Sequence, residues 1–414
     1  MNVVHIAGWV ATTALAVAVG LSSHVIANQS KNPVASIAAG FGPEGSAKAN
    51  LAVTTYAVRV AKDPKAAVKP LERAMARETY RSEPLSSAAV GIMAAAMRKP
   101  ADRQVREELL DLAGRLSRRN SLVATQILEA SALRGDNRTF FAWLSRSALT
   151  DDERRTLYVG AMADATARDG SVEALTPVIG PSPRWDETYW EMVVRRPTSL
   201  VNAAKVRIAV AGKPWRQTEI KSTDRKLAVN LADNGEFEMV RQLGLALGQG
   251  RGKRDANLIV NGNFARQPEL PPLDWNLTAL GNLGASIETR DKGLVISAIG
   301  GARGIAARQL IRLPAGRYTL GWVQSSSAPV KTDALFARIR CADPESDPLA
   351  AATIPLVTGK RSAAVEMPSD GCMWRWLSVE VAVPDDAAGV DAYLRDLSLT
   401  PAAETVAEMP PHRP

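Results

Sequence analysis

The segment at residues 373–383 presents two chemically different faces if it forms a β-strand, because successive side chains of a strand point to opposite sides. One face is aliphatic, and the other consists of Trp374, Trp376, Ser378 and Glu380. Flat aromatic rings can hold the apolar face of a pyranose, while polar groups at their edges bind its hydroxyls. The pattern predicts a sugar-binding platform of Trp374 and Trp376, with Glu380 or Arg338 as the hydrogen-bonding partner.

The same two tryptophans also have a structural explanation, in which they pack against another strand or dock onto the helical part of the chain. Exposure of both Trp374 and Trp376 would favour the sugar platform, and burial of both would favour the structural alternative. The other aromatic and aliphatic side chains of these strands are expected in the core: Leu377, Val379, Val381 and Val383, together with Tyr318, Leu320 and Trp322 at alternate positions of another strand.

Histidine-dependent catalysis is excluded from the body of the chain by the positions of its three histidines. His5 and His24 belong to the N-terminal segment, and His412 belongs to the C-terminal tail. The body of the chain between these two segments can therefore form neither a Ser–His–Asp triad nor a histidine-ligated metal site. A glycosidase needs only two facing carboxylates, for which Asp274 and Glu380 are candidates. We nevertheless predict a protein without catalytic activity, cofactor or metal centre.

The chain contains two cysteines, Cys341 at the end of one predicted strand and Cys372 at the start of another. A disulfide between them would cross-link the two strands and close the long connection that joins them. Such a bond forms in an oxidising compartment, so it would imply export from the cytoplasm. Two buried free thiols are the alternative.

Residues 255–400 contain short runs of β-branched and aromatic residues, separated by turn sequences at a spacing of about ten residues. No helical pattern alternates with these runs, which argues against a parallel sheet. We predict an antiparallel β-sandwich of the jelly-roll type. Its expected strands are 257–260, 284–289, 293–298, 304–313, 316–324, 334–341, 352–357, 373–383 and 390–399.

Three motifs of this segment resemble a carbohydrate-binding module with a galactose-binding-like jelly-roll fold. They are Asn257-Leu-Ile-Val-Asn-Gly-Asn-Phe264 with a following Trp275, the hairpin Leu313-Pro-Ala-Gly-Arg-Tyr-Thr-Leu320, and the closing Tyr393-Leu-Arg-Asp-Leu-Ser-Leu399. The resemblance covers nearly the whole segment and implies that it binds a poly- or oligosaccharide. It also implies a structural calcium ion. This chain departs from the family at two places: it has Asn263 and Ala265 where the family has an acidic pair, and Asp396 is the only acidic residue of its closing motif at 393–399.

Residues 46–250 show apolar residues at helical spacing, with Pro, Gly, Asn or Asp at the breaks. Three similar junctions start at Arg81, Arg118 and Arg195, with about 37 and then about 77 residues between their starts. Because one helix pair cannot bury its apolar face alone, we predict an α-solenoid of stacked helix pairs. The expected helices are 47–61, 65–79, 84–98, 101–118, 121–134, 137–148, 151–168, 185–195, 198–211, 222–233 and 236–248.

The predicted solenoid resembles the tetratricopeptide family in its alanines at close-packing positions and in the turn Leu231-Ala-Asp-Asn-Gly-Glu-Phe-Glu. The resemblance implies a concave groove that binds a protein partner. Arginines are expected to line this groove, unless they are ordinary surface residues: Arg118, Arg119, Arg195 and Arg196. Four tryptophans are expected to pack between helices and not to form a binding stripe: Trp143, Trp185, Trp190 and Trp215.

The formal net charge of +8 is unevenly distributed, because residues 31–254 are basic and residues 255–414 are slightly acidic. A basic region favours an anionic partner, such as an acidic polysaccharide, a lipid headgroup or an acidic protein. Nucleic acid is not expected as the partner of an exported protein. A solvated basic surface without a dedicated ligand is the alternative.

Residues 6–27 contain no Lys, Arg, Asp or Glu and are long enough for one membrane span. The end of this segment also has the small-residue pattern of a signal-peptidase site, so a cleaved signal is an alternative to a transmembrane anchor. A buried core helix is the third possibility. The positive-inside rule mildly favours a cytoplasmic body. The cysteines favour the opposite orientation, with the anchor in a bacterial inner membrane and the body in the periplasm.

These patterns predict a multidomain protein with both α and β domains. Residues 1–30 are the membrane anchor or signal, 46–250 the solenoid, 255–400 the sandwich and 401–414 a disordered tail, with a flexible basic linker at 249–254. The predicted function is that of a non-catalytic, membrane-anchored envelope scaffold, whose solenoid binds a protein and whose sandwich binds a glycan in exopolysaccharide assembly or export. The alternatives are a purely structural assembly protein without a sugar site and a polysaccharide-active enzyme.

Overall fold

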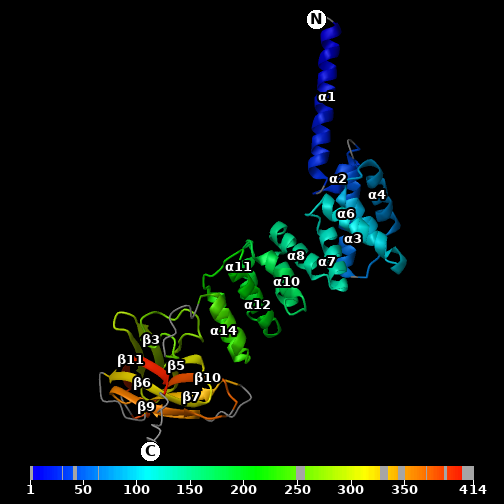
Figure 1. Cartoon of the computed structure of the whole chain (residues 1–414). Helices are drawn as coiled ribbons and strands as arrows, with labels where there is room; N and C mark the ends of the chain where they lie inside the picture. The colour runs from blue at the N-terminus through cyan, green and yellow to red at the C-terminus, as the bar shows by residue number, and fades with distance from the viewer. Residues whose placement is uncertain are drawn as a thin grey trace, which may run out of the picture. The chain divides into compact units, whose positions relative to one another are not determined.

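The computed structural model describes residues 3–29, 31–40, 44–63, 65–248, 257–326, 334–343, 350–369, 371–386 and 389–402. Helices occupy the first part of the chain and two antiparallel sheets occupy the last part (Figure 1). The chain divides into two compact units, Met1–Met162 and Ala163–Pro414. The predicted linker at 249–254 lies outside the described residues, as does nearly all of the predicted tail at 401–414.

Unit 1 is helical throughout its described residues. Consecutive helices pack together as α3 with α4, α5 with α6 and α7 with α8, and α3 also packs on α5 and α5 on α7. Helix pairs therefore stack in sequence order, as predicted. The helices are α1 (Val3–Asn28), α2 (Pro33–Ala38), α3 (Gly45–Lys62), α4 (Pro70–Ser82), α5 (Ser87–Ala96), η1 (Pro100–Asp102), α6 (Arg103–Leu116), α7 (Ser121–Arg134), α8 (Asn137–Thr150) and α9 (Arg155–Ala165), which ends in unit 2.

Unit 2 combines a further stack of helices with the β-sandwich. Here α10 packs on α12, and α12 packs on α14. Helix α10 was not expected, because Pro177 lies inside it and proline normally interrupts a helix by removing a donor. The helices are α10 (Ser171–Ile179), α11 (Asp186–Val193), η2 (Pro197–Ser199), α12 (Leu200–Ala211), α13 (Ser222–Asp233) and α14 (Phe237–Ala246).

The three similar junctions each lead into a helix. Ser86 caps α5 by accepting a hydrogen bond from the Ala89 N–H, and Asn120 caps α7 by accepting one from the Val123 N–H. Ser199 holds the same place before α12. The junctions are therefore helix starts, as expected from their sequences.

Hydrogen bonds between successive layers of helices recur at a nearly constant separation. Asn202 Nδ2 donates to the Thr166 carbonyl at 2.9 Å, across 36 residues. Asn230 Nδ2 donates to the Val194 carbonyl at 2.6 Å, again across 36 residues. This separation is close to the spacing of about 37 residues between the first two junctions and supports a helical repeat, whereas membership of the tetratricopeptide family stays a prediction.

The N-terminal segment folds as one long helix, α1 (Figure 1). In the described part of the chain, no helix has both the length and the apolar character needed to cross a membrane. The transmembrane anchor predicted for residues 6–27 is therefore not supported.

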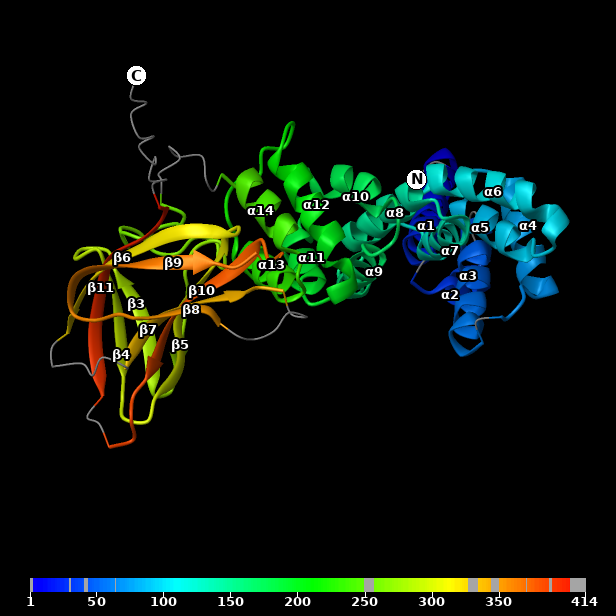
Figure 2. The same cartoon turned by 60° about the horizontal axis from the view of Figure 1, so that its bottom comes forward.

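The sandwich consists of a five-stranded sheet A, in the order β1-β5-β10-β7-β8, and a six-stranded sheet B, in the order β2-β3-β4-β11-β6-β9 (Figure 2). All strand pairs are antiparallel, and one apolar core fills the space between the sheets. The strands are β1 (Asn276–Leu277), β2 (Ala279–Leu280), β3 (Leu283–Glu288), β4 (Gly293–Ala298), β5 (Arg303–Arg312), β6 (Gly316–Ser326), β7 (Leu335–Cys341), β8 (Ala350–Pro355), β9 (Gly359–Met367), β10 (Trp374–Ala382) and β11 (Val390–Pro401).

Of the predicted strands only 257–260 is not found, whereas the two-residue strands β1 and β2 and the longer strand β9 were not predicted. Residues 257–260 form no strand, because the Ile259 N–H donates to the side chain of Asn257 and the Val260 N–H donates to the side chain of Gln309. Strand β9 was missed because it forms an edge of sheet B and exposes most of its side chains, Lys360 and Arg361 among them. Such polar edge strands lack the alternating pattern that marks a half-buried strand.

Candidate functional site

The outer face of sheet A brings together the predicted sugar-binding residues. The alternating aliphatic side chains of β10 point into the core, as expected, so Trp374, Trp376 and Glu380 point away from it. In the register of the sheet, Ser378 lies opposite Arg308 of β5 and Arg338 of β7, and Trp376 lies opposite Arg340. Side chains from three strands therefore meet on one surface.

Glu380 lies between two arginines of this face, Arg338 and Arg340. Arg338 contacts one of its oxygens at 2.9 Å, and Arg340 lies 3.6 Å from the other. The Ser378 hydroxyl donates to the same carboxylate at 2.7 Å. Glu380 is only 8% exposed, so its oxygens are engaged in orienting the two arginines. Arg340, which was not among the predicted residues, could have been found from its alternation with Arg338 along the strand.

The two tryptophans have different environments. Trp376 is partly buried, and the Arg308 guanidinium lies 4.5 Å from the centroid of its ring. Trp374 is also partly buried, and its ring centroid lies 6.2 Å from that of Phe237 at the start of α14. The two tryptophans are therefore neither both exposed nor both buried. Trp374 contacts a helix, as the structural explanation expects, whereas Trp376 lies on the arginine-rich surface.

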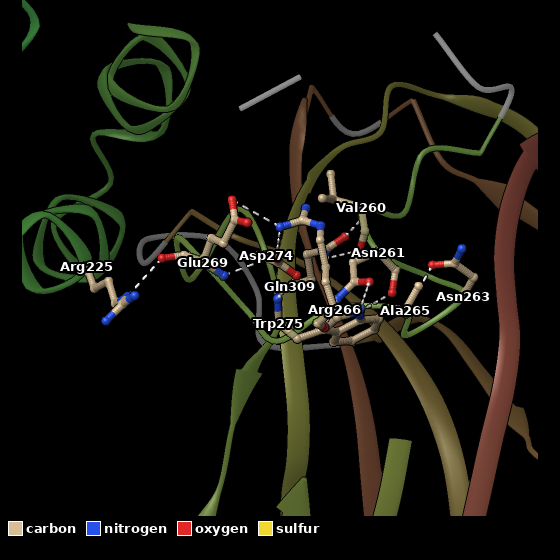
Figure 3. Close-up of polar contacts among 10 residues, drawn as sticks. All are labelled: Arg225, Val260, Asn261, Asn263, Ala265, Arg266, Glu269, Asp274, Trp275 and Gln309. Carbon is tan, nitrogen blue, oxygen red and sulfur yellow. Dashed lines mark hydrogen bonds and ion pairs between the residues drawn. The ribbon is translucent and has the colours of Figure 1, made fainter. Parts of the chain in front are cut away.

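Helices α13 and α14 cover the β5 side of this face. Asp233 at the end of α13 lies 3.5 Å from Arg308. Hydrogen bonds from Arg241 hold the pKa of Glu238 on α14 below its usual range, and the charge of Arg312 on β5 contributes. Arg225 of α13 donates a hydrogen bond of 2.9 Å to the carbonyl of Glu269, which Figure 3 shows as the link between a helix and the sandwich.

The opening motif of the sandwich forms a clasp at one end of the sheets (Figure 3). Val260 and Gln309 exchange two hydrogen bonds of 2.9 Å, and Gln309 is fully buried. Asn261 donates through its side chain to the Arg266 carbonyl at 2.8 Å and accepts at its own carbonyl from the Trp275 indole. The asparagine-rich motif is therefore explained by contacts within the fold.

Asp274 is fully buried next to this clasp. It accepts hydrogen bonds from the Trp275 and Glu269 N–H groups, at 2.8 and 3.3 Å, and Arg266 lies 3.1 Å from its carboxylate (Figure 3). Burial raises the pKa of Asp274 above its usual range, although these donors and the arginine act in the opposite direction.

The described residues do not fit the structural calcium ion that the family resemblance implies. Among them, no group of three His, Cys, Asp or Glu side chains could hold a metal ion. The buried carboxyl at the clasp, Asp274, is paired with the cationic side chain of Arg266. Asn263 accepts a hydrogen bond from the Ala265 N–H and offers no charged ligand.

The two carboxyls considered for a glycosidase belong to separate ion pairs. Asp274 is held by Arg266 at the clasp, and Glu380 is held by Arg338 and Arg340 on the outer face of sheet A. The absence of catalytic activity stays a prediction.

The four arginines predicted to line a partner-binding groove belong to different units. Arg118 and Arg119 are exposed at the turn between α6 and α7, and only Arg118 lines a pocket there. In unit 2, Arg196 forms an ion pair with Asp164 and donates to the Met192 carbonyl at 2.7 Å, while Arg195 is exposed. Sequence reasoning missed the other arginines of the pocket, which are Arg115 of α6, Arg134 of α7 and Arg146 of α8.

Two further predictions about side chains are confirmed. Cys341 and Cys372 form a disulfide, with their Cα atoms 5.9 Å apart. Trp143, Trp185 and Trp190 are buried between helices. The fourth tryptophan, Trp215, is only partly buried and lies directly against Gly180, where a Cβ atom would clash with the indole.

No protein-family model matches the sequence, and no curated protein matches it in a sequence search. Among solved structures, the sandwich is similar to a protein described under "CBM4 structure and function", with 19% identity over 35% of this chain and 99% of that chain and a TM-score of 0.27. It is also similar to TmCBM61 in complex with beta-1,4-galactotriose, with 14% identity over 35% and 99% and a TM-score of 0.25. A third match is the arabinose-bound MgGH51 α-L-arabinofuranosidase, with 14% identity over 37% and 27% and a TM-score of 0.26.

Proposed function

We propose that the sandwich binds an acidic oligosaccharide through the outer face of sheet A. The observation that carries the proposal is an excess of arginine over carboxylate on this face. Arg338 and Arg340 share the single carboxylate of Glu380, so the cluster keeps a positive charge. Guanidinium groups bind carboxylates through paired N–H donors, which suits a uronate. Trp376 adds an aromatic surface beside them.

We further propose that the chain acts as a non-catalytic scaffold outside the cytoplasm, in which the helices recruit a protein partner and the sandwich holds the glycan. Exopolysaccharide assembly or export would use both activities. The Cys341–Cys372 disulfide supports an oxidising compartment such as the periplasm. In this proposal the segment at 6–27 serves export, by cleavage as a signal or by retention at the inner membrane.

Affinity electrophoresis of the full chain tests the glycan proposal. Gels would contain alginate, a polyuronate, or dextran, a neutral glucan, and we expect alginate alone to retard the protein. The double variant Trp376→Ala, Arg340→Gln should bind alginate at least about tenfold more weakly than the wild type, because one charged hydrogen-bonding group and the aromatic surface are lost. Arg338 is kept because it pairs with buried Glu380.

The matched control is Arg361→Gln, which removes an exposed arginine from β9 of sheet B. This variant should be retarded like the wild type. Equal retardation of the double variant and the wild type, with both folded by circular dichroism, would exclude the outer face of sheet A as the glycan site. Equal retardation of the wild type in dextran and in alginate would show that binding does not depend on the acidic groups of the sugar.

The second candidate is a purely structural protein whose sandwich has no sugar site, and one observation favours it. Trp374 packs against Phe237, so half of the predicted platform is part of the contact between sandwich and helices. Under this alternative, Trp374→Ala loosens that contact, and neither glycan retards the chain.

A further inference from the structure

A trough with an apolar floor and an arginine rim lies on unit 1. Its main pocket has a volume of about 400 Å³ between α6, α7 and α8. The floor is apolar and includes Leu110, Ile127 and Ala130. A neighbouring pocket of about 300 Å³ shares Leu110, Ala130, Glu107 and Arg134 with it, so the two are continuous. The rim of the main pocket carries Arg115, Arg118, Arg134 and Arg146.

The floor depends on one close contact between helices. A Cβ atom at Gly114 of α6 would lie 2.8 Å from the Trp143 ring and 3.1 Å from Ile127. Glycine therefore lets the indole of α8 lie directly under α6. The Trp143 ring is 6% exposed, and the Arg146 guanidinium lies 5.2 Å from its centroid.

The rim contains more positive charge than its own carboxylates neutralise. Asp111 pairs with Arg115 at 2.7 Å, and Glu107 pairs with Arg134 at 2.9 Å. Arg118 and Arg146 form no ion pair with any residue that the structure describes. Burial lowers the pKa of Arg146, and the charge of Arg118 lowers it further, so the two cations repel each other.

We propose that this trough binds an acidic peptide segment of a partner protein. Arg118 and Arg146 hold a carboxylate of the peptide, and the floor receives a neighbouring aliphatic side chain. A carboxylate placed between two guanidinium groups relieves their repulsion and accepts charge-assisted hydrogen bonds from both. The inference deepens the proposed recruitment of a protein by the helices and is independent of glycan binding by the sandwich.

The floor favours a peptide over an acidic sugar. Stacking of a pyranose requires an exposed aromatic face, whereas Trp143 is buried. A pocket of about 400 Å³ lined by Leu110 and Ile127 suits an aliphatic side chain. The arginines then select peptides in which such a side chain lies next to Glu or Asp.

Fluorescence anisotropy with the full chain tests the proposal directly. The probes are short labelled peptides in which leucine alternates with glutamate, with glutamine or with lysine, and a labelled oligouronate. We expect the glutamate peptide to bind, with an affinity that falls as salt is added, and the glutamine and lysine peptides to bind at least about tenfold more weakly. Equal binding of the glutamine peptide, or binding of the oligouronate alone, would overturn the proposal.

The site is located by the double variant Arg118→Gln, Arg146→Gln. Neither side chain has an ion pair among the described residues, so the fold should survive, which circular dichroism checks. Affinity for the glutamate peptide should fall about tenfold or more. The control is Arg119→Gln, because Arg119 is the exposed neighbour of Arg118 and does not line the pocket.

An unchanged affinity in the double variant, or an equal loss in Arg119→Gln, would show that the peptide does not bind at this trough. The double variant should still be retarded by alginate if the sandwich binds glycans. Failure of the peptide proposal and failure of the glycan proposal are therefore separate results.

Discussion

The two arginine-rich surfaces of this protein differ in how far their charge is neutralised. On the outer face of sheet A, Glu380 pairs with Arg338 and Arg340, and Asp233 of α13 lies near Arg308. In the trough on unit 1, Arg118 has no ion pair among the described residues. The comparison shows that the count of arginines on a surface does not measure its capacity to bind an anion, which depends on the carboxylates that already lie there.

The helices and the sandwich also differ in the reach of their polar contacts. Asn230 bonds to the Val194 carbonyl across 36 residues, which is one repeat of the helical stack. Asn257 bonds to the Leu397 carbonyl across 140 residues and so joins the two ends of the sandwich. Local contacts let neighbouring helices stabilise each other, whereas the sandwich requires its whole chain. Three stability experiments sharpen this comparison.

The largest effect is expected for Asp224→Ala in the helical part of unit 2. Asp224 accepts two hydrogen bonds from Arg207, at 2.7 and 3.0 Å, and both side chains are only 3% exposed. Removal of the carboxylate leaves a buried cation without its counter-ion, which costs about 3–5 kcal/mol. Urea unfolding followed by circular dichroism at helical wavelengths measures the change.

Asp164→Ala is the control, because Asp164 pairs with Arg196 but is 69% exposed. Its effect should stay below about 1 kcal/mol. Similar costs for Asp224→Ala and Asp164→Ala would contradict the role assigned to the buried pair.

A somewhat smaller effect is expected for the double variant Cys341→Ser, Cys372→Ser. The disulfide closes a loop with a sequence separation of 31, so its removal should destabilise the sandwich by about 3 kcal/mol through the entropy of the unfolded chain. Limited proteolysis should then cut the sandwich faster and leave α3 to α8 as resistant as before. Faster cleavage within those helices would contradict the separation of unit 1 from the sandwich.

The smallest effect concerns the pH dependence that Asp274 contributes. Burial raises its pKa in the folded state, so the folded protein binds a proton more tightly than the unfolded chain. The contribution of Asp274 to the free energy of unfolding is fully present at a pH below its pKa in the unfolded chain. It is lost as the pH rises through its higher pKa in the folded protein. Asp274→Asn should remove this loss, so the wild type should be destabilised relative to the variant as pH rises from acid toward neutral. Thermal unfolding across that range measures the difference, and a constant difference would contradict the assignment.

The sequence predicted most elements well because their patterns are local. Helices α7 and α13 begin and end at the predicted residues, 121–134 and 222–233. It failed where a local pattern was broken or absent, at Pro177 inside α10 and in the exposed edge strand β9. For the site, it predicted which side chains of β10 share a face, but it did not identify Arg340 or Arg308 as their neighbours.

The sequence by itself determined the helices, the strands and their core-facing sides, because apolar side chains recur with the period of each element. The tertiary structure alone decided which charges neutralise one another. Glu380 pairs with two arginines of another strand, Trp374 packs against a helix, and Arg118 lies across a pocket from a second cation. These contacts join segments that are far apart in the chain. The electrostatic energy of a charged group depends on the neighbours that folding brings to it and not on its place in a local sequence pattern.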